Sequence, residues 1–429
     1  MNSPTMVRLR AARAGFVTLM MVGSTSVTLA QQAPQTQTDD YTRYELQAPG
    51  SGAFRIFYDV SATTPGARYY FNTIRAGAEE EVHGVTDLHT GQPLAWEVVD
   101  GGHARANGHP RADLDGHYIK VTLARPVPEG GQGRVRIDKT YIDRASYFVE
   151  GDELVFDRSL GIRRNAVVLP AGYELVEANY PVQVETEDDG RVRASFMQPG
   201  PDAVPFRVRA RPLPGGPVRV RRTRSDEPVP VSGGGAPERA RVDYIVTDRA
   251  FEDRDITYFL LDPSTHSFRL FHDYTESRPG VDRYINVVRA GSSASDPEAT
   301  NLDTGERLRV EQLKGAEIQS RGIDVGGPAD EETEVVVIWF DPVQAGSSVR
   351  LRIWETYTDA GRYTQMGDEL VWDRNFGRAR NTVVLPAGWA LAANAIPGVV
   401  DETEDGRIRI RYVNPRPDGI QVFIRGRRR

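Results

Sequence analysis

The sequence predicts an all-β protein made of two tandem antiparallel β-sandwich domains of the same fold. Three observations predict this. Long stretches recur in the same order in the two halves of the chain. The apolar runs are short and alternate with charged residues, and Gly and Pro are abundant, at 41 and 28 of 429 residues. Such a composition suits many short strands joined by turns.

The recurring stretches indicate an internal duplication. FRIFYDVSATTPGARYYFNTIRAG begins at Phe54, and FRLFHDYTESRPGVDRYINVVRAG begins at Phe268. GDELVFDRSLGIRRNAVVLPAGYEL begins at Gly151, and GDELVWDRNFGRARNTVVLPAGWAL begins at Gly367. This period is far longer than that of a solenoid repeat, so each copy is expected to be a domain with its own core.

Composition then divides the chain into five segments. We expect a signal peptide at 1–30, a disordered N-terminal segment at 31–43, copy 1 at 44–211, a Pro/Gly-rich linker at 212–240 and copy 2 at 241–429. The linker assignment rests on RPLPGGPVRVRRTRSDEPVPVSGGGAPERA, which ends shortly after a triple glycine. Segments of this composition connect domains without packing against them.

The first thirty residues have the features of a secretory signal peptide. Three arginines precede an apolar stretch that ends in Thr28-Leu29-Ala30, where the small residues fit a signal-peptidase site. An uncleaved membrane anchor is the alternative, although residues 23–26 interrupt the stretch and it is short for a span. We therefore expect a periplasmic or secreted protein with no membrane span after cleavage.

Charge and cysteine content narrow the possible partners. The net charge is −7, and removing the three arginines of the leader leaves −10, which argues against nucleic-acid binding. The chain has no cysteine, so disulfides and a lipoprotein anchor are excluded. Neither a phosphate loop nor a dinucleotide fingerprint is present, and we expect no cofactor. An unknown protein or glycan is the expected partner.

The strand pattern within each copy supports two packed sheets. Runs such as YIKVTLA, GRVRIDKTY and RVRASF are rich in Val, Ile, Tyr and Phe and alternate with charged residues. Asp189-Gly190 and Asp405-Gly406 separate two such runs in each copy and predict a hairpin. One face of each sheet is thus expected to be solvated and the other packed.

Catalytic motifs are missing from the sequence. It contains no HExxH, no G-x-S-x-G elbow and no histidine with a recognisable serine partner. Three histidines in a Gly-rich loop of copy 1, His103, His109 and His117, are weak candidates for a metal site. The competing interpretation is a solvated loop with incidental histidines, and we expect neither a metal nor an enzymatic activity.

An arginine–asparagine motif is the most informative polar feature. Planar guanidinium groups bind carboxylates or phosphates in a bidentate manner, so the motif could bind an anionic glycan, a peptide carboxylate or a partner protein. Alternatively, its side chains satisfy turns within each domain, and its presence in both copies favours this structural role. The candidate binding residues are Arg158, Arg164 and Asn165 in copy 1 and Arg374, Arg380 and Asn381 in copy 2.

One part of the sequence resembles a known family. The run YIKVTLARPVPEGGQGRVRIDKTY from Tyr118, together with NAVVLPAGYEL from Asn165, resembles the N-terminal β-domain of exported zinc aminopeptidases of the thermolysin-like superfamily. The chain also resembles exported bacterial tandem β-sandwich proteins. The resemblance implies a β-sandwich, but the family's HExxH motif and helical catalytic domain have no counterpart here, so no functional residue carries over.

These observations favour a non-enzymatic exported binding or scaffold protein. Two alternatives remain. A glycan- or peptide-acting hydrolase could have its site between the two modules. A carbohydrate-binding module would need exposed coplanar aromatic side chains among the five tryptophans.

Overall fold

The computed structural model describes residues 34–214, 248–326, 329–416 and 418–429. Residues Ala33–Arg429 form one compact unit. The described residues are mostly in strands, and the two α-helices are short: α1 (Gly101–Ala106) and α2 (Ala316–Ser320). The predicted all-β fold class is confirmed, whereas the predicted signal peptide lies outside the described residues.

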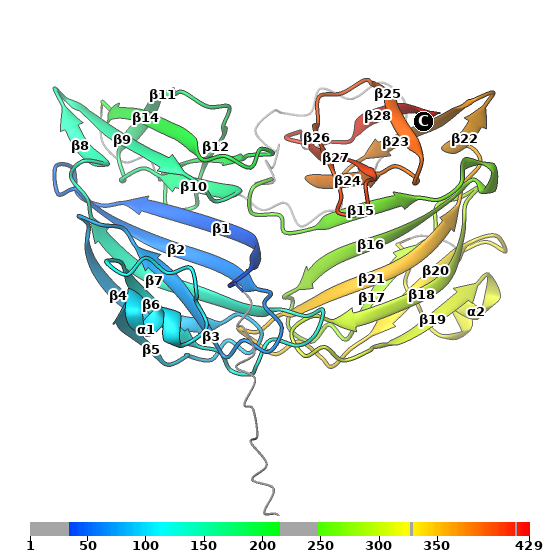
Figure 1. Cartoon of the computed structure of the whole chain (residues 1–429), viewed down its shortest axis with the longest axis horizontal. Coiled ribbons are helices and arrows are strands. Elements are labelled where there is room, and N and C mark those ends of the chain that lie inside the picture. Colours follow the sequence, from blue (N-terminus) through cyan, green and yellow to red (C-terminus); the bar gives the residue numbers. More distant parts are fainter. Residues whose placement is uncertain (1–33, 215–247, 327–328, 417) are drawn as a thin grey trace, which may run out of the picture. The chain divides into compact units, whose positions relative to one another are not determined.

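Copy 1 contains three sheets (Figure 1). The largest has the order β12 (Gln183–Thr186), β13 (Val192–Met197), β10 (Arg164–Val168), β1 (Gln37–Leu46), β2 (Ala53–Ala62), β7 (Gly133–Ile142) and β4 (Glu79–Asp87). A four-stranded sheet has the order β11 (Tyr173–Ala178), β14 (Val204–Pro212), β9 (Glu153–Leu160) and β8 (Tyr147–Glu150). A three-stranded sheet has the order β3 (Tyr69–Ile74), β6 (His117–Thr122) and β5 (Trp96–Asp100).

Copy 2 repeats these three sheets. The largest has the order β26 (Val399–Glu402), β27 (Ile408–Val413), β24 (Arg380–Val384), β15 (Asp255–Leu260), β16 (Ser267–Glu276), β21 (Val349–Thr358) and β18 (Ser293–Asn301). The four-stranded sheet has the order β25 (Trp389–Asn394), β28 (Ile420–Arg428), β23 (Glu369–Phe376) and β22 (Tyr363–Met366). The three-stranded sheet has the order β17 (Arg283–Val287), β20 (Glu334–Trp339) and β19 (Arg309–Lys314), and η2 (Pro263–Thr265) precedes β16.

The two copies therefore share one strand order. Strand pairs are antiparallel except β1 with β10 and β15 with β24, which are parallel at equivalent places. A register shift occurs in β4 of copy 1 and in its counterpart β18 of copy 2. A second register shift occurs in β11 and in its counterpart β25. Gly190 and Gly406 have positive φ in the predicted Asp-Gly hairpins.

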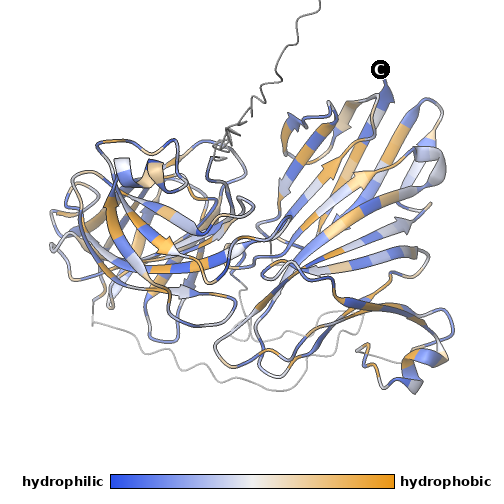
Figure 2. Ribbon diagram, turned by 60° about the horizontal axis from the view of Figure 1, so that its bottom comes forward, coloured by the Kyte–Doolittle hydropathy of each residue, from blue (hydrophilic) through white to orange (hydrophobic). Residues whose placement is uncertain are grey.

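Each sandwich has a hydrophobic core with an aromatic centre. Phe156 packs 5.5 Å from both Tyr44 and Phe54 in copy 1, measured between ring centroids. Trp372 takes the place of Phe156 in copy 2, 4.8 Å from Phe268. Along the strands, apolar and polar residues alternate (Figure 2), as expected for sheets that bury one face.

The predicted domain boundaries need one correction. Residues 37–43, expected to be disordered, belong to β1, which pairs with both β2 and β10. Tyr41 is buried there, so this segment is part of the fold. At the other end of copy 1, β14 extends to Pro212. Most of the predicted linker falls in residues 215–247, outside the described residues.

Candidate functional site

Four arginines line a small, solvent-open cavity where the two copies meet. One aspartate is the only carboxylate among the lining residues. Copy 1 contributes Arg163, Arg164, Met197, Gln198 and Pro199. Copy 2 contributes Asp255, Arg380, Asn381, Thr382, Arg411, Tyr412 and Val413.

The shared strand order brings the predicted motif to this cavity from both sides. Arg164 is the first residue of β10, and Arg380 is the first residue of the equivalent strand β24. Each strand begins directly after a turn and pairs in parallel with the first strand of its copy. Three of the six predicted binding residues, Arg164, Arg380 and Asn381, thus line one cavity.

Backbone carbonyls of the segment before β15 hold the two motif arginines in place. Arg164 Nη1 donates to the carbonyl oxygens of Ala250 at 3.1 Å and Phe251 at 3.3 Å. Arg380 Nη2 donates to the carbonyl oxygen of Asp253 at 3.1 Å. Because these contacts use part of each guanidinium, the two arginines are fixed in the wall of the cavity.

The positive charges of Arg163 and Arg411 are more available to a ligand than those of Arg164 and Arg380. Arg411 Nη2 lies 3.0 Å from Asp401, and Arg163 is exposed. Among the described residues, Arg163 forms no ion pair. Burial lowers the pKa of Arg411, and the positive charges of Arg163 and Arg409 lower it further. The arrangement therefore favours a negative group that lies between Arg163 and Arg411.

Each of the two motif asparagines donates a hydrogen bond to the backbone of its own copy. Asn165 Nδ2 donates to the carbonyl of Ile162 at 2.6 Å, and Asn381 Nδ2 donates to the carbonyl of Arg378 at 3.0 Å. These equivalent hydrogen bonds close the turn before β10 and β24. Sequence reasoning had favoured such a turn role for the motif, and Asn381 combines it with a place in the cavity wall.

Arg158 and Arg374 lie inside the sandwiches, away from the cavity. Arg158 Nη1 lies 2.9 Å from Asp143 Oδ2, and its guanidinium lies over the rings of Phe54 and Tyr141. Arg374, its counterpart, lies 3.7 Å from Asp359 and over three aromatic rings. Both side chains are largely buried, so the structure assigns them a packing role.

We expect Arg158→Met to lower the free energy of unfolding by about 1–3 kcal/mol, because Asp143 loses a charged hydrogen-bond partner. Urea unfolding measures the change. Arg211→Met is the matched control, since Arg211 pairs with Glu174 at an exposed position, where the loss of an ion pair has little effect on stability. Equal losses in the two variants would contradict the packing role.

Two of the three candidate metal-binding histidines have contacts of another kind. His109 stacks on Phe71 at 5.8 Å and lies edge-on to Tyr118, and burial lowers its pKa. His103 Nε2 lies 3.1 Å from Lys120 Nζ, a cation that disfavours a metal ligand. Within the described ranges, no group of three or more His, Cys, Asp or Glu side chains could hold a metal ion.

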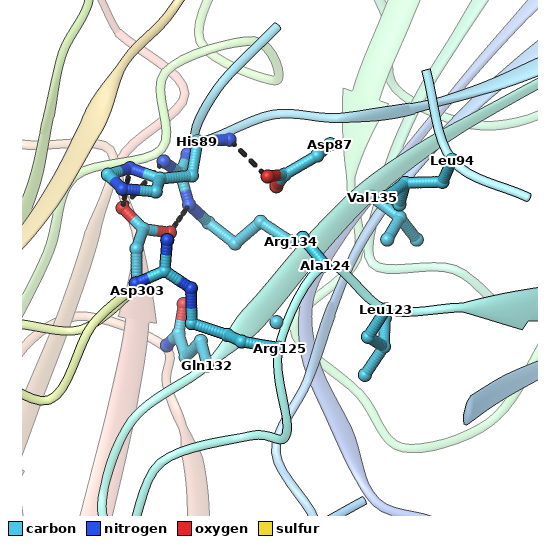
Figure 3. Close-up of a pocket in the computed structure, with 11 residues that line it drawn as sticks. Asp87, His89, Leu94, Leu123, Ala124, Arg125, Gln132, Arg134, Val135 and Asp303 are labelled. Carbon is cyan, nitrogen blue, oxygen red and sulfur yellow. Dashed lines mark hydrogen bonds and ion pairs between the residues drawn. The ribbon is translucent and has the colours of Figure 1, made fainter. Parts of the chain in front are cut away.

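A buried ion pair joins the two copies near a second, smaller cavity of about 290 Å³ (Figure 3). Arg134 of copy 1 donates through Nε and Nη2 to the carboxylate of Asp303 of copy 2, at 2.6 and 2.9 Å. His89 Nδ1 lies 3.3 Å from the same carboxylate. Burial opposes ionisation of Asp303, but Arg134 and His89 hold its pKa well below its usual range.

This joint, by which we mean the ion pair of Arg134 and Asp303 between the copies, was not predicted from the sequence. The repeat nevertheless contained a signal of it. His89 and Asp303 occupy equivalent positions, in TDLHTG and TNLDTG respectively. A backbone hydrogen bond from Gln132 N to Leu302 O, at 2.6 Å, lies beside the ion pair. A basic residue in copy 1 and an acidic residue at the same repeat position in copy 2 therefore lie against each other where the copies meet.

No family model and no curated protein matches the chain. Among solved structures it is similar to an M1 zinc metallopeptidase from Deinococcus radiodurans, at 14% identity and a TM-score of 0.30, over 42% of this chain and 43% of that one. It is also similar to an aminopeptidase N family protein from Idiomarina loihiensis, at 10% identity and a TM-score of 0.25, over 40% and 29%. The chain thus spans less than half the length of these proteins.

A third similar structure is a collagen adhesin from S. aureus, at 9% identity and a TM-score of 0.17, over 80% of this chain and 86% of that one. The first two structures belong to the family that the sequence resembles, so the predicted resemblance is confirmed as a weak structural likeness. In the part of the chain that the structure describes, no helix is long and apolar enough to cross a membrane.

Proposed function

We propose that the chain is an exported, non-enzymatic binding protein that binds a carboxylate-bearing ligand in the arginine-lined cavity. The observation that supports this proposal is the composition of the cavity wall, where four guanidinium groups and a single carboxylate converge from both copies. Guanidinium groups bind carboxylates with two parallel hydrogen bonds, which gives both affinity and orientation. The predicted signal peptide supports a periplasmic or secreted location.

The cavity favours binding over hydrolysis. Glycoside hydrolysis usually needs two carboxyl groups, which lie about 5–9.5 Å apart across the scissile bond. Asp255 is the single carboxylate among the lining residues. Two of the five tryptophans, Trp372 and Trp389, are buried in the core of copy 2 and cannot stack on a sugar, whereas Trp96 is exposed.

The test is calorimetric binding of a short oligogalacturonate, with a hexaglutamate peptide as the second carboxylate probe. We expect the Arg163→Gln/Arg411→Gln variant to bind at least about tenfold more weakly, because charged hydrogen bonds contribute about 1.5–3 kcal/mol each. Raising the salt concentration should weaken binding to the wild-type protein.

The matched control is Arg207→Gln/Arg425→Gln, which removes two arginines paired with Glu150 and Glu369 away from the cavity. This variant has the same net charge as the cavity variant and should bind as the wild type does. If neither probe binds the wild-type protein, or if both double variants lose affinity equally, the proposal is wrong.

A further inference from the structure

Copy 2 contains a second group of basic side chains that does not line the cavity. Arg254 is half-buried and Arg378 is exposed. Neither guanidinium forms an ion pair with any carboxylate among the described residues. The nearby acids already have partners, since Glu252 pairs with Arg249 at 2.8 Å and Glu276 pairs with Arg278 at 2.6 Å.

Aromatic rings form a floor beneath Arg254. Its guanidinium carbon lies 4.2 Å from the ring centroid of Tyr274 and 5.8 Å from that of Tyr284. His272 lies edge-on to Tyr284, with the ring centroids 5.7 Å apart. The His272 side chain is buried, and its Nε2 atom has no hydrogen-bond partner among the described residues.

The equivalent positions in copy 1 form a hydrogen-bonded cluster that contains an acidic residue in place of the basic ones. The strand pairing places Asp40 at the position of Arg254 and Tyr58 at that of His272. Gln37 Nε2 donates to Asp40 at 2.6 Å and to the Tyr58 hydroxyl at 2.9 Å, and the Tyr58 and Tyr70 hydroxyls lie 3.2 Å apart. The shared fold therefore does not require basic residues at this place.

The pKa of His272 reflects the excess of positive charge around its side chain. Burial, with the charges of Arg254, Arg378 and Arg350, lowers the pKa of His272 to about 3. An anion beside these groups would reduce the mutual repulsion of the arginines.

We propose that Arg254, which lies over the rings of Tyr274 and Tyr284, and Arg378 form an oxyanion-binding site beside His272 that is specific to copy 2. Two guanidinium groups can hold the oxygens of a phosphate or carboxylate group from two sides. The aromatic floor lies beneath Arg254, so its guanidinium can face the anion. This site uses none of the residues that line the cavity, so it is independent of the proposed function.

The test is calorimetric titration with inorganic phosphate and, separately, with acetate. It uses the full chain carrying Arg163→Gln/Arg411→Gln as the reference protein, so that the cavity does not contribute to binding of the probe. We expect saturable binding of at least one of them, and the preferred probe distinguishes a phosphate from a carboxylate ligand. Arg254→Asp/Arg378→Ile installs the residues that copy 1 carries at these positions. It should weaken binding at least tenfold and leave the thermal unfolding temperature close to that of the wild type.

Two further measurements keep the test decisive. Arg254→Gln/Arg378→Gln replaces the first variant if that one does not fold, and Arg207→Gln/Arg425→Gln, which removes two surface arginines outside both sites, should leave the affinity for the probe unchanged. In the wild type, the bound anion should also raise the pKa of His272 in an NMR titration of the imidazole. The proposal is overturned if neither anion binds, or if binding survives the loss of Arg254 and Arg378.

Discussion

Asp303→Asn should lower the free energy of unfolding by about 3–5 kcal/mol, because it leaves the buried Arg134 guanidinium without its carboxylate partner. Arg134 and Asp303 are 6% and 3% exposed, so water cannot replace the lost partner. The ion pair connects copy 1 to copy 2, and we expect urea unfolding of the variant to become less cooperative between the two copies.

The control for this prediction has the same geometry at an exposed position. Arg136 donates to both oxygens of Asp59 at 2.6 Å, but the side chains of Arg136 and Asp59 are 40% and 16% exposed, so water reaches this pair. Asp59→Asn should therefore cost about 0–1 kcal/mol. If Asp303→Asn destabilises the protein no more than Asp59→Asn does, the joint does not hold the copies together.

Glu355→Gln should stabilise the protein at pH 8 by up to about 3 kcal/mol and leave its stability at pH 4 nearly unchanged. Burial raises the pKa of Glu355 to about 7, against an ordinary value of 4.5, although Asn286 donates to the carboxylate at 2.8 and 2.9 Å. The folded state thus binds the proton more tightly than the unfolded state. Stability is lost as the pH rises from about 4.5 through about 7, and glutamine removes this loss.

Chemical unfolding of the wild type and the variant between pH 4 and pH 8 measures this difference. Glu298→Gln is the control, because Glu298 lies at an exposed edge and pairs with Arg307 on the surface. A constant difference between wild type and Glu355→Gln across this pH range would contradict the buried, protonated state of Glu355.

The fold was largely predictable from the sequence, because repeats and strand alternation are local signals. The beginning of copy 1 was not, since Gln37–Arg43 reads QTDDYTR and lacks the apolar alternation of the other strands. This segment becomes a strand because β2 and β10 flank it on both sides. Tertiary pairing overrides the weak local preference there.

The candidate site was predictable only in part. The motif that recurs in both copies contains Arg164, Arg380 and Asn381, so the repeat made these residues visible. Arg411 comes from a different strand, β27, and reaches the cavity because Thr382 of β24 pairs with it. Arg158 stands close to Arg164 in sequence but lies on β9, inside the sandwich. The contact between the two copies determines which arginines face the shared cavity. The sequence of a single copy carries no information about that contact.

The most direct test of the shared cavity is a double-mutant cycle on oligogalacturonate affinity with Arg163→Gln, Arg411→Gln and the combined variant. Arg163 belongs to copy 1 and Arg411 to copy 2, so one ligand that contacts both must couple them. We predict that each single variant weakens binding and that the two changes are non-additive, with a coupling energy of about 0.5–3 kcal/mol. Strict additivity, or a single variant that binds as the wild type does, would contradict a site that the two copies share.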